Sequence, residues 1–457
     1  MPSTVGPVCA TRPVGGGGVT HRRGTVRARA GGVEEASSFD PRAFRRSLSA
    51  TENYNRRVAN DEEALAQMSE QGIGAVSVGG LIAEMKESEY TYERGDVTLK
   101  LAKSFGFCWG VERAVQMAYE ARKSFPTEKL WITNEIIHNP TVNQRLKDMG
   151  VEFIEDVDGK GKDFSGVEGG DVVILPAFGA SVQEMKLLND KSAKIVDTTC
   201  PWVSKVWNAV DTHTRKNYTS VIHGKWAHEE TIATASFAST YLIVKDMKEA
   251  NYVRDFILAD DDKRAEMRPE FMEKFKNAMS ADFDPEQHLD AVGIANQTTM
   301  LKGETEELGR LFQNTMIEKF GPEKVNDHFM VMDTICDATQ ERQDAMFELV
   351  GQDEPDLPKD VDMILVVGGY NSSNTSHLQE IAEHNKIPSF WVDTKERVGP
   401  GNVIAHRTSW GELVTTENWL PDGPVRIGVT SGASTPDKVV EDVLDEIFAI
   451  KESMVAA

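Results

Sequence analysis

The feature that most constrains the fold is a regular alternation, from Val97 onward, of short apolar runs with amphipathic segments. The apolar runs are rich in β-branched residues, which favour strands. The segments between them repeat with a period near 3.6 residues, which is typical of helices. Strands that alternate with helices indicate βαβ units, so the sequence predicts an α/β fold with mostly parallel sheets. The strands are expected at residues 97–102, 129–133, 171–178, 193–199, 218–224, 240–244, 291–298, 328–334, 362–369, 388–393 and 425–432.

The first 33 residues differ in composition from the rest of the chain. Between Met1 and Val33 there is no Asp or Glu, and there are five arginines. An arginine-rich, acid-free leader without an apolar core is typical of organellar transit peptides, so we expect residues 1–40 to be a transit peptide. The alternative is a disordered tail that has no targeting role.

The chain as a whole is strongly acidic. It has 50 basic and 73 acidic residues, which gives a net charge of −23. Nucleic-acid binding needs basic surface, so we expect no nucleic-acid partner and instead a small-molecule ligand. Because no run of apolar residues is long enough to span a bilayer, no association with a membrane is expected.

Composition and rhythm predict a division of the remaining chain. Residues 41–97 are polar and charged, and we interpret them as an N-terminal extension. Three αβ modules are expected at residues 98–199, 200–330 and 331–457, the last of which ends in a C-terminal helix. Residues 246–288 are dense in charge, and their second half lacks a strand pattern, so they are expected to form a helical surface insertion in the second module.

Three cysteines share one local setting. Cys108, Cys200 and Cys336 each follow a predicted strand and precede a predicted helix. A thiolate at a helix N-terminus faces the positive end of the helix dipole, which favours the ionised, metal-binding form. Three such thiolates could bind three irons of a cubane and leave one iron open to substrate. Ordinary buried thiols remain an alternative, and zinc is another, although no cysteine pair has zinc-site spacing.

Other polar residues also follow predicted strands, at the strand ends where open parallel sheets place their ligands. Taken singly, each Ser or Asn fits a helix N-cap and each His fits a surface or capping position. Their recurrence predicts a cavity lined by three thiols, two imidazoles, a carboxylate and an anion-binding rim of hydroxyls and backbone N–H groups. These residues occur around His138, His228–Glu230, Thr298, Asn371–Asn374 and Ser431–Ser434.

At these residues the chain resembles the 4-hydroxy-3-methylbut-2-enyl diphosphate reductase family. The resemblance extends from about Phe44 to near the C-terminus. Its motifs are GFCWGVERA, NEIIHNPTVN, DTTCPWVSKVW, HEETIATAS, ANQTTMLKGETEE, DTICDATQERQ, GGYNSSNTSHLQEI and GVTSGASTPDKVVEDV. The N-terminal segment, the charged insertion and the sequence ILPAFGAS resemble the plant, algal and cyanobacterial branch.

The resemblance implies a trefoil of three αβ modules around a 4Fe–4S cluster held by Cys108, Cys200 and Cys336. It implies two-electron removal of the substrate hydroxyl to give isopentenyl and dimethylallyl diphosphates, the last step of the non-mevalonate (MEP) pathway. Glu230 matches the family's proton donor, and Thr298 matches the hydroxyl that relays the proton. The substrate contacts would come from His138, His228, Thr298, Ser372, Ser373, Asn374 and Ser434.

The same resemblance implies a location and an electron donor. Together with the leader it places the enzyme in the plastid stroma, with ferredoxin as the donor. Ferredoxins are acidic, so docking on this acidic chain needs a local basic patch. One position departs from the family pattern, because Phe178 stands where many bacterial members carry a histidine. Position 178 is therefore given no polar role, and another residue must compensate.

Two other classes of protein also fit part of the pattern. An iron–sulfur sensor without turnover would account for the three cysteines, but it would not account for Glu230, Thr298 and the Ser/Asn rim. A hydro-lyase would use the open iron as a Lewis acid without net reduction.

Overall fold

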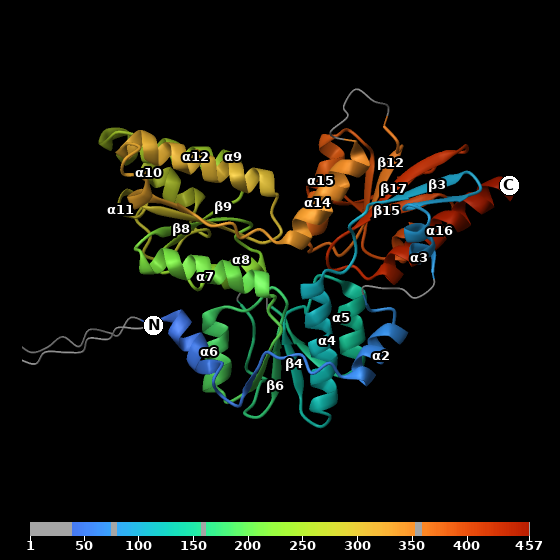
Figure 1. Cartoon of the computed structure of the whole chain (residues 1–457), viewed down its shortest axis with the longest axis horizontal. Coiled ribbons are helices and arrows are strands. Elements are labelled where there is room, and N and C mark those ends of the chain that lie inside the picture. The colour runs from blue at the N-terminus through green and yellow to red at the C-terminus, as the bar shows by residue number, and fades with distance from the viewer. Residues whose placement is uncertain (1–38, 75–79, 157–160, 352–358, 457) are drawn as a thin grey trace, which may run out of the picture. The chain divides into compact units, whose positions relative to one another are not determined.

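The computed structural model describes residues 39–74, 80–156, 161–351 and 359–456, and the expected α/β class is confirmed (Figure 1). Three sheets made mostly of parallel strands carry the helices. Most of the predicted transit peptide lies outside the described residues. Among the described residues, no helix is both long and apolar enough to cross a membrane.

The first sheet has five parallel strands in the order β1-β7-β6-β4-β5. Its edge strand comes from the N-terminal extension, where Tyr54 pairs with Ile195. Every residue of the central strand β6 is buried, as expected for a parallel strand covered on both faces. The strands are β1 (Tyr54–Asn55), β4 (Leu130–Thr133), β5 (Val151–Ile154), β6 (Val172–Leu175) and β7 (Lys194–Asp197). The helices of this part are α1 (Pro41–Leu48), α2 (Glu62–Glu70), α4 (Trp109–Ser124), α5 (Pro140–Asp148) and α6 (Val182–Asp190).

The second sheet has four parallel strands in the order β11-β10-β8-β9, with α7 and α8 on one face and α9 and α12 on the other (Figure 1). The strands are β8 (Thr219–His223), β9 (Tyr241–Val244), β10 (Val292–Asn296) and β11 (Phe329–Val331). The helices are α7 (Pro201–Arg215), α8 (Glu229–Ala235), α9 (Met247–Leu258), α10 (Asp261–Lys274), α11 (Pro285–His288), α12 (Lys302–Phe320) and α13 (Val325–His328). Residues 246–288 contain the helices α9, α10 and α11, and Phe256 and Phe271 of this segment lie in the core.

The third sheet follows the order β14-β15-β13-β12-β17-β3-β2, with β16 paired to β15. The strand β3, with which the predicted first module begins, lies in this sheet because Val97 pairs with Val425. The strands are β2 (Thr91–Arg94), β3 (Val97–Leu101), β12 (Met363–Val367), β13 (Ser389–Val392), β14 (Val398–Gly399), β15 (Val403–Arg407), β16 (Leu413–Glu417) and β17 (Val425–Ser431). The helices are α3 (Leu81–Glu87), α14 (Asp337–Val350), α15 (Ser373–His384), η1 (Lys395–Arg397) and α16 (Asp437–Ala456).

Each expected strand is present, and its ends either match the expectation or are shorter by one to three residues. The sequence did not predict β1, β2, β5 or the antiparallel strands β14–β16. These strands are short or lie toward a sheet edge, where burial imposes little pattern on the sequence.

Candidate functional site

Each of the three cysteines is the N-cap residue of a helix. Cys108 precedes α4, Cys200 precedes α7 and Cys336 precedes α14. None of the three side chains caps its own helix, and all three thiols are free. The thiols are therefore available to another partner at the positive ends of three helix dipoles.

The positions of the cysteines along the chain follow a cycle. Cys108 leaves β3 of the third sheet and begins α4, which packs on the first sheet. Cys200 leaves β7 of the first sheet and begins a helix on the second sheet. Cys336 leaves β11 of the second sheet and begins a helix on the third. Each thiol thus marks the point where the chain passes from one sheet to the next.

The three thiols line one cavity of about 100 Å³. All of the predicted site residues lie around this cavity, although they come from segments that follow eight different strands. The predicted residues are Cys108, His138, Cys200, His228, Glu230, Thr298, Cys336, Ser372, Ser373, Asn374 and Ser434. The lining also includes Val111, Ile137, Ala177, Phe178, Trp202, Val203, Thr299, Ala338, Thr339 and Ala433.

Two of the cysteine-bearing helices meet closely. A Cβ atom added to Gly110, in the first turn of α4, would lie 2.5 Å from the Sγ atom of Cys200. Only glycine allows this approach, since real Cβ contacts of that length do not occur. Burial, with a smaller contribution from the neighbouring thiols, raises the pKa of Cys200 to about 11 and that of Cys336 to about 12.

A buried carboxyl faces the same cavity. Glu230 is 3% exposed, and its Oε1 atom accepts a hydrogen bond of 2.5 Å from the backbone N–H of Thr298. The hydroxyl of Thr298 donates a second hydrogen bond, of 2.9 Å, to Oε2. Burial outweighs these two bonds and raises the pKa of Glu230 to about 7. At neutral pH this carboxyl can therefore both hold and release a proton.

The two predicted histidines form an aromatic group with Phe178. The ring of His138 stacks on Phe178 with a centroid separation of 4.8 Å and an interplanar angle of 12°. The Nδ1 atom of His138 is 2.8 Å from Glu135, whereas its Nε2 atom is buried without a hydrogen-bond partner in the described structure. The Nδ1 atom of His228 accepts from the backbone N–H of Glu230, and burial lowers the pKa of His228 well below its ordinary value. His228 is thus a neutral imidazole.

The Ser/Asn rim lies at the start of α15 and in the turn after β17. Ser372 is the N-cap of α15 and accepts from the backbone N–H of Thr375. Asn374 accepts from the backbone N–H of Ala433, while its side-chain NH₂ group is buried without a partner among the described residues. Ser434 donates to the carbonyl of His138 at 3.2 Å. An open amide and a helix N-terminus favour an anion at this rim.

Sequence reasoning missed two cations beside the rim. Lys225 and Arg407 line a neighbouring pocket of about 110 Å³ together with His228, Ser372 and Ser373. The Nζ atom of Lys225 donates to Ser376 at 3.3 Å. Lys225 lies two residues after the end of β8, which was a usable signal, whereas Arg407 comes from an antiparallel strand that the sequence did not predict.

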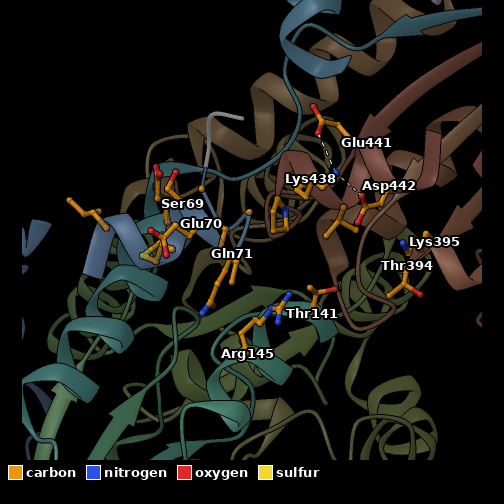
Figure 2. Close-up of a pocket in the computed structure, with 18 of the residues that line it drawn as sticks. Ser69, Glu70, Gln71, Thr141, Arg145, Thr394, Lys395, Lys438, Glu441 and Asp442 are labelled. Carbon is orange, nitrogen blue, oxygen red and sulfur yellow. Dashed lines mark ion pairs between the residues drawn. The ribbon is translucent and has the colours of Figure 1, made fainter. Parts of the chain in front are cut away.

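A larger cavity of about 810 Å³ lies among α2, α5 and α16 (Figure 2). Its lining mixes both signs of charge, and Lys438 pairs there with Glu441 and Asp442. None of the predicted site residues borders it. Size alone therefore does not identify the functional cavity.

The thiol-lined cavity lies at the carboxyl ends of parallel strands, where α/β enzymes with open sheets place their ligands. The family model described as "LytB protein" matches residues 99–448. The chain belongs to this family, the 4-hydroxy-3-methylbut-2-enyl diphosphate reductases, so the resemblance found in the sequence is confirmed.

Its relatives cover nearly all of the described chain. A 4-hydroxy-3-methylbut-2-enyl diphosphate reductase of Picosynechococcus is 60% identical over 413 residues, which cover 90% of this chain and 98% of the relative. A chloroplastic reductase of Botryococcus braunii is 58% identical over 422 residues, covering 92% and 83%. The solved structure of the corresponding reductase from Plasmodium falciparum has a TM-score of 0.54 at 23% identity, covers 76% of this chain and 86% of its own, and shares the fold.

Proposed function

We propose that this chain reduces (E)-4-hydroxy-3-methylbut-2-enyl diphosphate to isopentenyl and dimethylallyl diphosphates. The observation that carries the proposal is the meeting of three free helix-capping thiols and a buried, protonatable carboxyl around one cavity. The reaction consumes two electrons and two protons and releases the substrate hydroxyl as water. It requires an electron source, a proton donor and a site for a diphosphate.

The donor set fits a 4Fe–4S cluster held by Cys108, Cys200 and Cys336. In the described residues, no three His, Cys, Asp or Glu side chains converge on a point that could bind a single metal ion. The thiols instead surround the cavity, which suits a polynuclear group in which each thiolate binds a different iron. Burial raises the pKa of Cys200 and Cys336, and a bound cationic group would favour their ionised form. When bound, such a cluster supplies electrons and a Lewis-acidic iron for the substrate hydroxyl.

The protein's own part in the chemistry is proton delivery. The Oε2 atom of Glu230 shares its hydrogen bond with the hydroxyl of Thr298, and both residues line the cavity. The hydroxyl of Thr298 can accept a proton from Glu230 while it donates one to the leaving oxygen. These contacts support Glu230 as the proton donor and Thr298 as the relay.

The rim binds the diphosphate. Ser372, Ser373 and Asn374 present hydroxyls, an amide and the N-terminus of α15 to the anion, and Ser434 adds a hydroxyl from the opposite turn. The open Nε2 atom of His138 and the neutral ring of His228 provide further contacts. Lys225 and Arg407 supply positive charge beside Ser372, which compensates for the apolar Phe178.

The cyclic order of the cysteines supports a trefoil of three αβ modules around the cluster, since each module would contribute one thiol and one sheet. The chloroplastic relative and the acid-free leader support a location in the plastid stroma. The electron donor there is ferredoxin.

The test is an anaerobic assay of cluster-reconstituted full chain with reduced methyl viologen and the hydroxymethylbutenyl diphosphate. We expect substrate-dependent oxidation of the dye, and no such oxidation would refute the proposed reaction. Glu230→Gln should keep the cluster spectrum but lose most turnover. Glu229→Gln is the matched control, because Glu229 bonds to Asn134 and Lys162 instead and does not border the cavity.

A further inference from the structure

We propose that an arginine-lined groove on the N-terminal extension docks an acidic one-electron carrier protein. This inference rests on the proposed function and names the surface where electrons enter. The arginine groove consists of Arg42, Arg45, Arg46, Arg56 and Arg57, which line a hollow of about 670 Å³ between α1, β1 and α7.

The charge of the groove contrasts with the charge of the chain. Five arginines line it, against the two carboxylates of Glu52 and Asp211. The chain as a whole carries a net charge of −23. A local basic surface on an acidic protein selects and orients an acidic partner, while the rest of the surface repels that partner.

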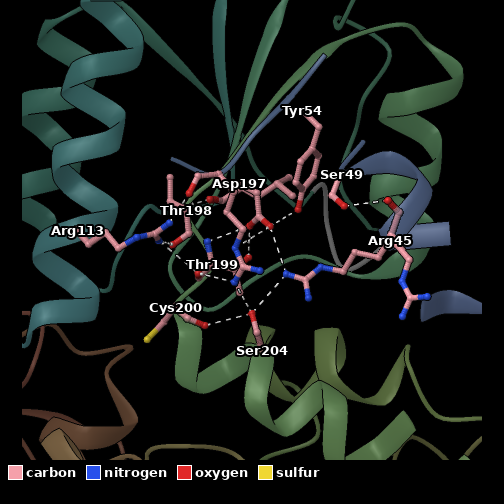
Figure 3. Close-up of polar contacts among 12 residues, drawn as sticks. Arg45, Ser49, Tyr54, Arg113, Asp197, Thr198, Thr199, Cys200 and Ser204 are labelled. Atoms are coloured by element: carbon pink, nitrogen blue, oxygen red, sulfur yellow. Dashed lines mark hydrogen bonds and ion pairs between the residues drawn. The ribbon is translucent and has the colours of Figure 1, made fainter. Parts of the chain in front are cut away.

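Arg42 pairs with Asp211 at 2.9 Å, and the other four arginines divide into an inner and an outer group. The guanidinium groups of Arg45 and Arg56 face inward to the buried carboxylate of Asp197, at 3.4 and 3.6 Å. Figure 3 shows the contact between Arg45 and Asp197. Arg46 and Arg57 are exposed, and neither forms an ion pair within the described part of the chain. An exposed arginine without an ion pair contributes little to the stability of the fold. The charges of Arg46 and Arg57 are therefore available to a partner.

The inner arginines connect the groove to the proposed cluster ligand Cys200. An Nη2 atom of Arg56 donates to the carbonyl of Thr199 at 3.3 Å and to the hydroxyl of Ser204 at 2.5 Å. The Ser204 hydroxyl lies 3.4 Å from the carbonyl of Cys200. Figure 3 shows this network between Arg45 and Cys200. A carrier seated in the groove would thus be separated from the ligand by one layer of hydrogen-bonded residues.

The electron count requires two docking events for each substrate molecule. Each event oxidises one carrier by one electron and reduces the cluster by one. Two electrons and two protons then convert one substrate into one product and one water. Because the carrier must leave and be replaced between events, binding has to be fast and weak, which suits electrostatic steering by exposed arginines.

The experiment compares two electron donors on the holoenzyme. Arg46→Glu/Arg57→Glu reverses the two outer charges and leaves the arginines that hold Asp197 in place. With reduced plant-type ferredoxin as the probe, we expect kcat/KM for the donor to fall by about tenfold or more. With reduced methyl viologen, turnover should match the wild type. Added salt should weaken the ferredoxin reaction of the wild type more steeply than that of the variant.

Two further variants separate docking from general effects. Arg254→Glu/Arg310→Glu makes the same change in net charge on α9 and α12 and should leave both reactions unchanged. Arg46→Gln/Arg57→Gln removes the charges without reversing them, and it should give an intermediate loss with ferredoxin. Calorimetric titration with oxidised ferredoxin at low salt should show binding that the Arg46→Glu/Arg57→Glu variant loses.

Three results would overturn the proposal: an unchanged ferredoxin reaction in the Arg46→Glu/Arg57→Glu variant, an equal loss with both donors, or tighter binding of a DNA oligonucleotide than of ferredoxin. Failure of the wild type with both donors would instead refute the proposed reaction, and the calorimetric titration would still decide the docking.

Discussion

Replacing Asp197 by Asn should cost the protein about 3 kcal/mol of stability, because this carboxylate organises the contact between the N-terminal extension and the loop of Cys200. Asp197 is fully buried. Its Oδ1 atom accepts from the backbone N–H of Thr199 at 2.9 Å, and its Oδ2 atom accepts from the hydroxyl of Tyr54. Arg45 and Arg56 lie beside the same Oδ2 atom. Figure 3 shows Asp197 with Tyr54 and Arg45.

The magnitude follows from what the substitution leaves behind. Asparagine keeps the bond from the backbone N–H of Thr199, but it removes the carboxylate that pairs with the guanidinium groups of Arg45 and Arg56. Breaking a buried ion pair costs about 3–5 kcal/mol. The side chains of Arg45 and Arg56 are 16% and 32% exposed, so water recovers part of this cost and the lower end applies.

The effect has a defined pH dependence. Burial alone would raise the pKa of Asp197, but Arg56, Arg45 and the hydrogen bonds from Thr199 and Tyr54 hold that pKa below its ordinary value of 3.8. A lowered carboxyl pKa stabilises the folded state at pH values above the unfolded pKa, and this contribution is lost as the pH falls through the folded pKa. The penalty should therefore be constant from pH 8 to pH 5 and shrink below about pH 4.

Urea unfolding followed by circular dichroism measures the penalty. The matched control is Asp362→Asn, which removes the carboxylate of an exposed pair with Arg426 and should cost at most about 1 kcal/mol. Equal costs in the two variants at pH 7 would refute the reasoning, and so would a penalty for Asp197→Asn that changes between pH 8 and pH 5.

Three further predictions concern the cavity. Gly110→Ala should abolish the visible absorbance of the reconstituted cluster, because its Cβ atom would lie 2.5 Å from the Sγ atom of Cys200. The control Gly303→Ala, which has open space around the added Cβ atom, should keep that absorbance. A normal cluster spectrum in Gly110→Ala would show that α4 and α7 can move apart. Phe178→Ala should raise the KM for substrate about three- to tenfold with little change in kcat, since the ring that stacks on His138 is lost; an unchanged KM in steady-state assays would contradict that role. Turnover driven by methyl viologen should fall about tenfold per pH unit above about pH 7, because burial raises the pKa of Glu230 to about 7 and only the protonated acid donates; a pH profile that is flat between 6 and 9 would exclude Glu230 as the limiting acid.

The sequence predicted those parts of the fold and site that depend on local pattern. The strands buried on both faces, such as β6, β8 and β12, are continuous apolar runs, so their positions could be read directly. The predicted residues of the cavity each lie in the segment that follows a predicted strand, although β3 and β11, which precede Cys108 and Cys336, are only partly buried. The placement of β3 in the third sheet was not predictable, because its partner Val425 lies more than 300 residues away and no local pattern records that pairing.

The same limit hid the polar network around Asp197. Its acid lies in a predicted strand, but Arg45, Tyr54 and Arg56 come from a polar extension whose residues have no period. Their role appears only when β1 pairs with β7 and carries them to the loop before Cys200. For the same reason the basic patch that an acidic carrier requires could not be found in the sequence, because its arginines are distributed over two short segments of the extension.

One cysteine lies at each point where the chain passes from one sheet to the next. This arrangement explains how residues from three parts of the chain form a single cavity. A helix that begins at the end of one strand and packs on another sheet must cross between the two sheets at its N-terminus. The chain crosses between sheets in this way three times, at Cys108, Cys200 and Cys336. The third crossing leads back to the sheet from which the first one began, because β3 and β17 lie side by side in that sheet. The N-termini of the three helices, which carry the positive ends of the helix dipoles, then face a common space. The thiols at these N-termini are brought together although they lie far apart in the sequence. A shift of any one helix by a turn would remove its thiol from the cavity, so cluster binding and the packing of all three sheets should be lost together under denaturant.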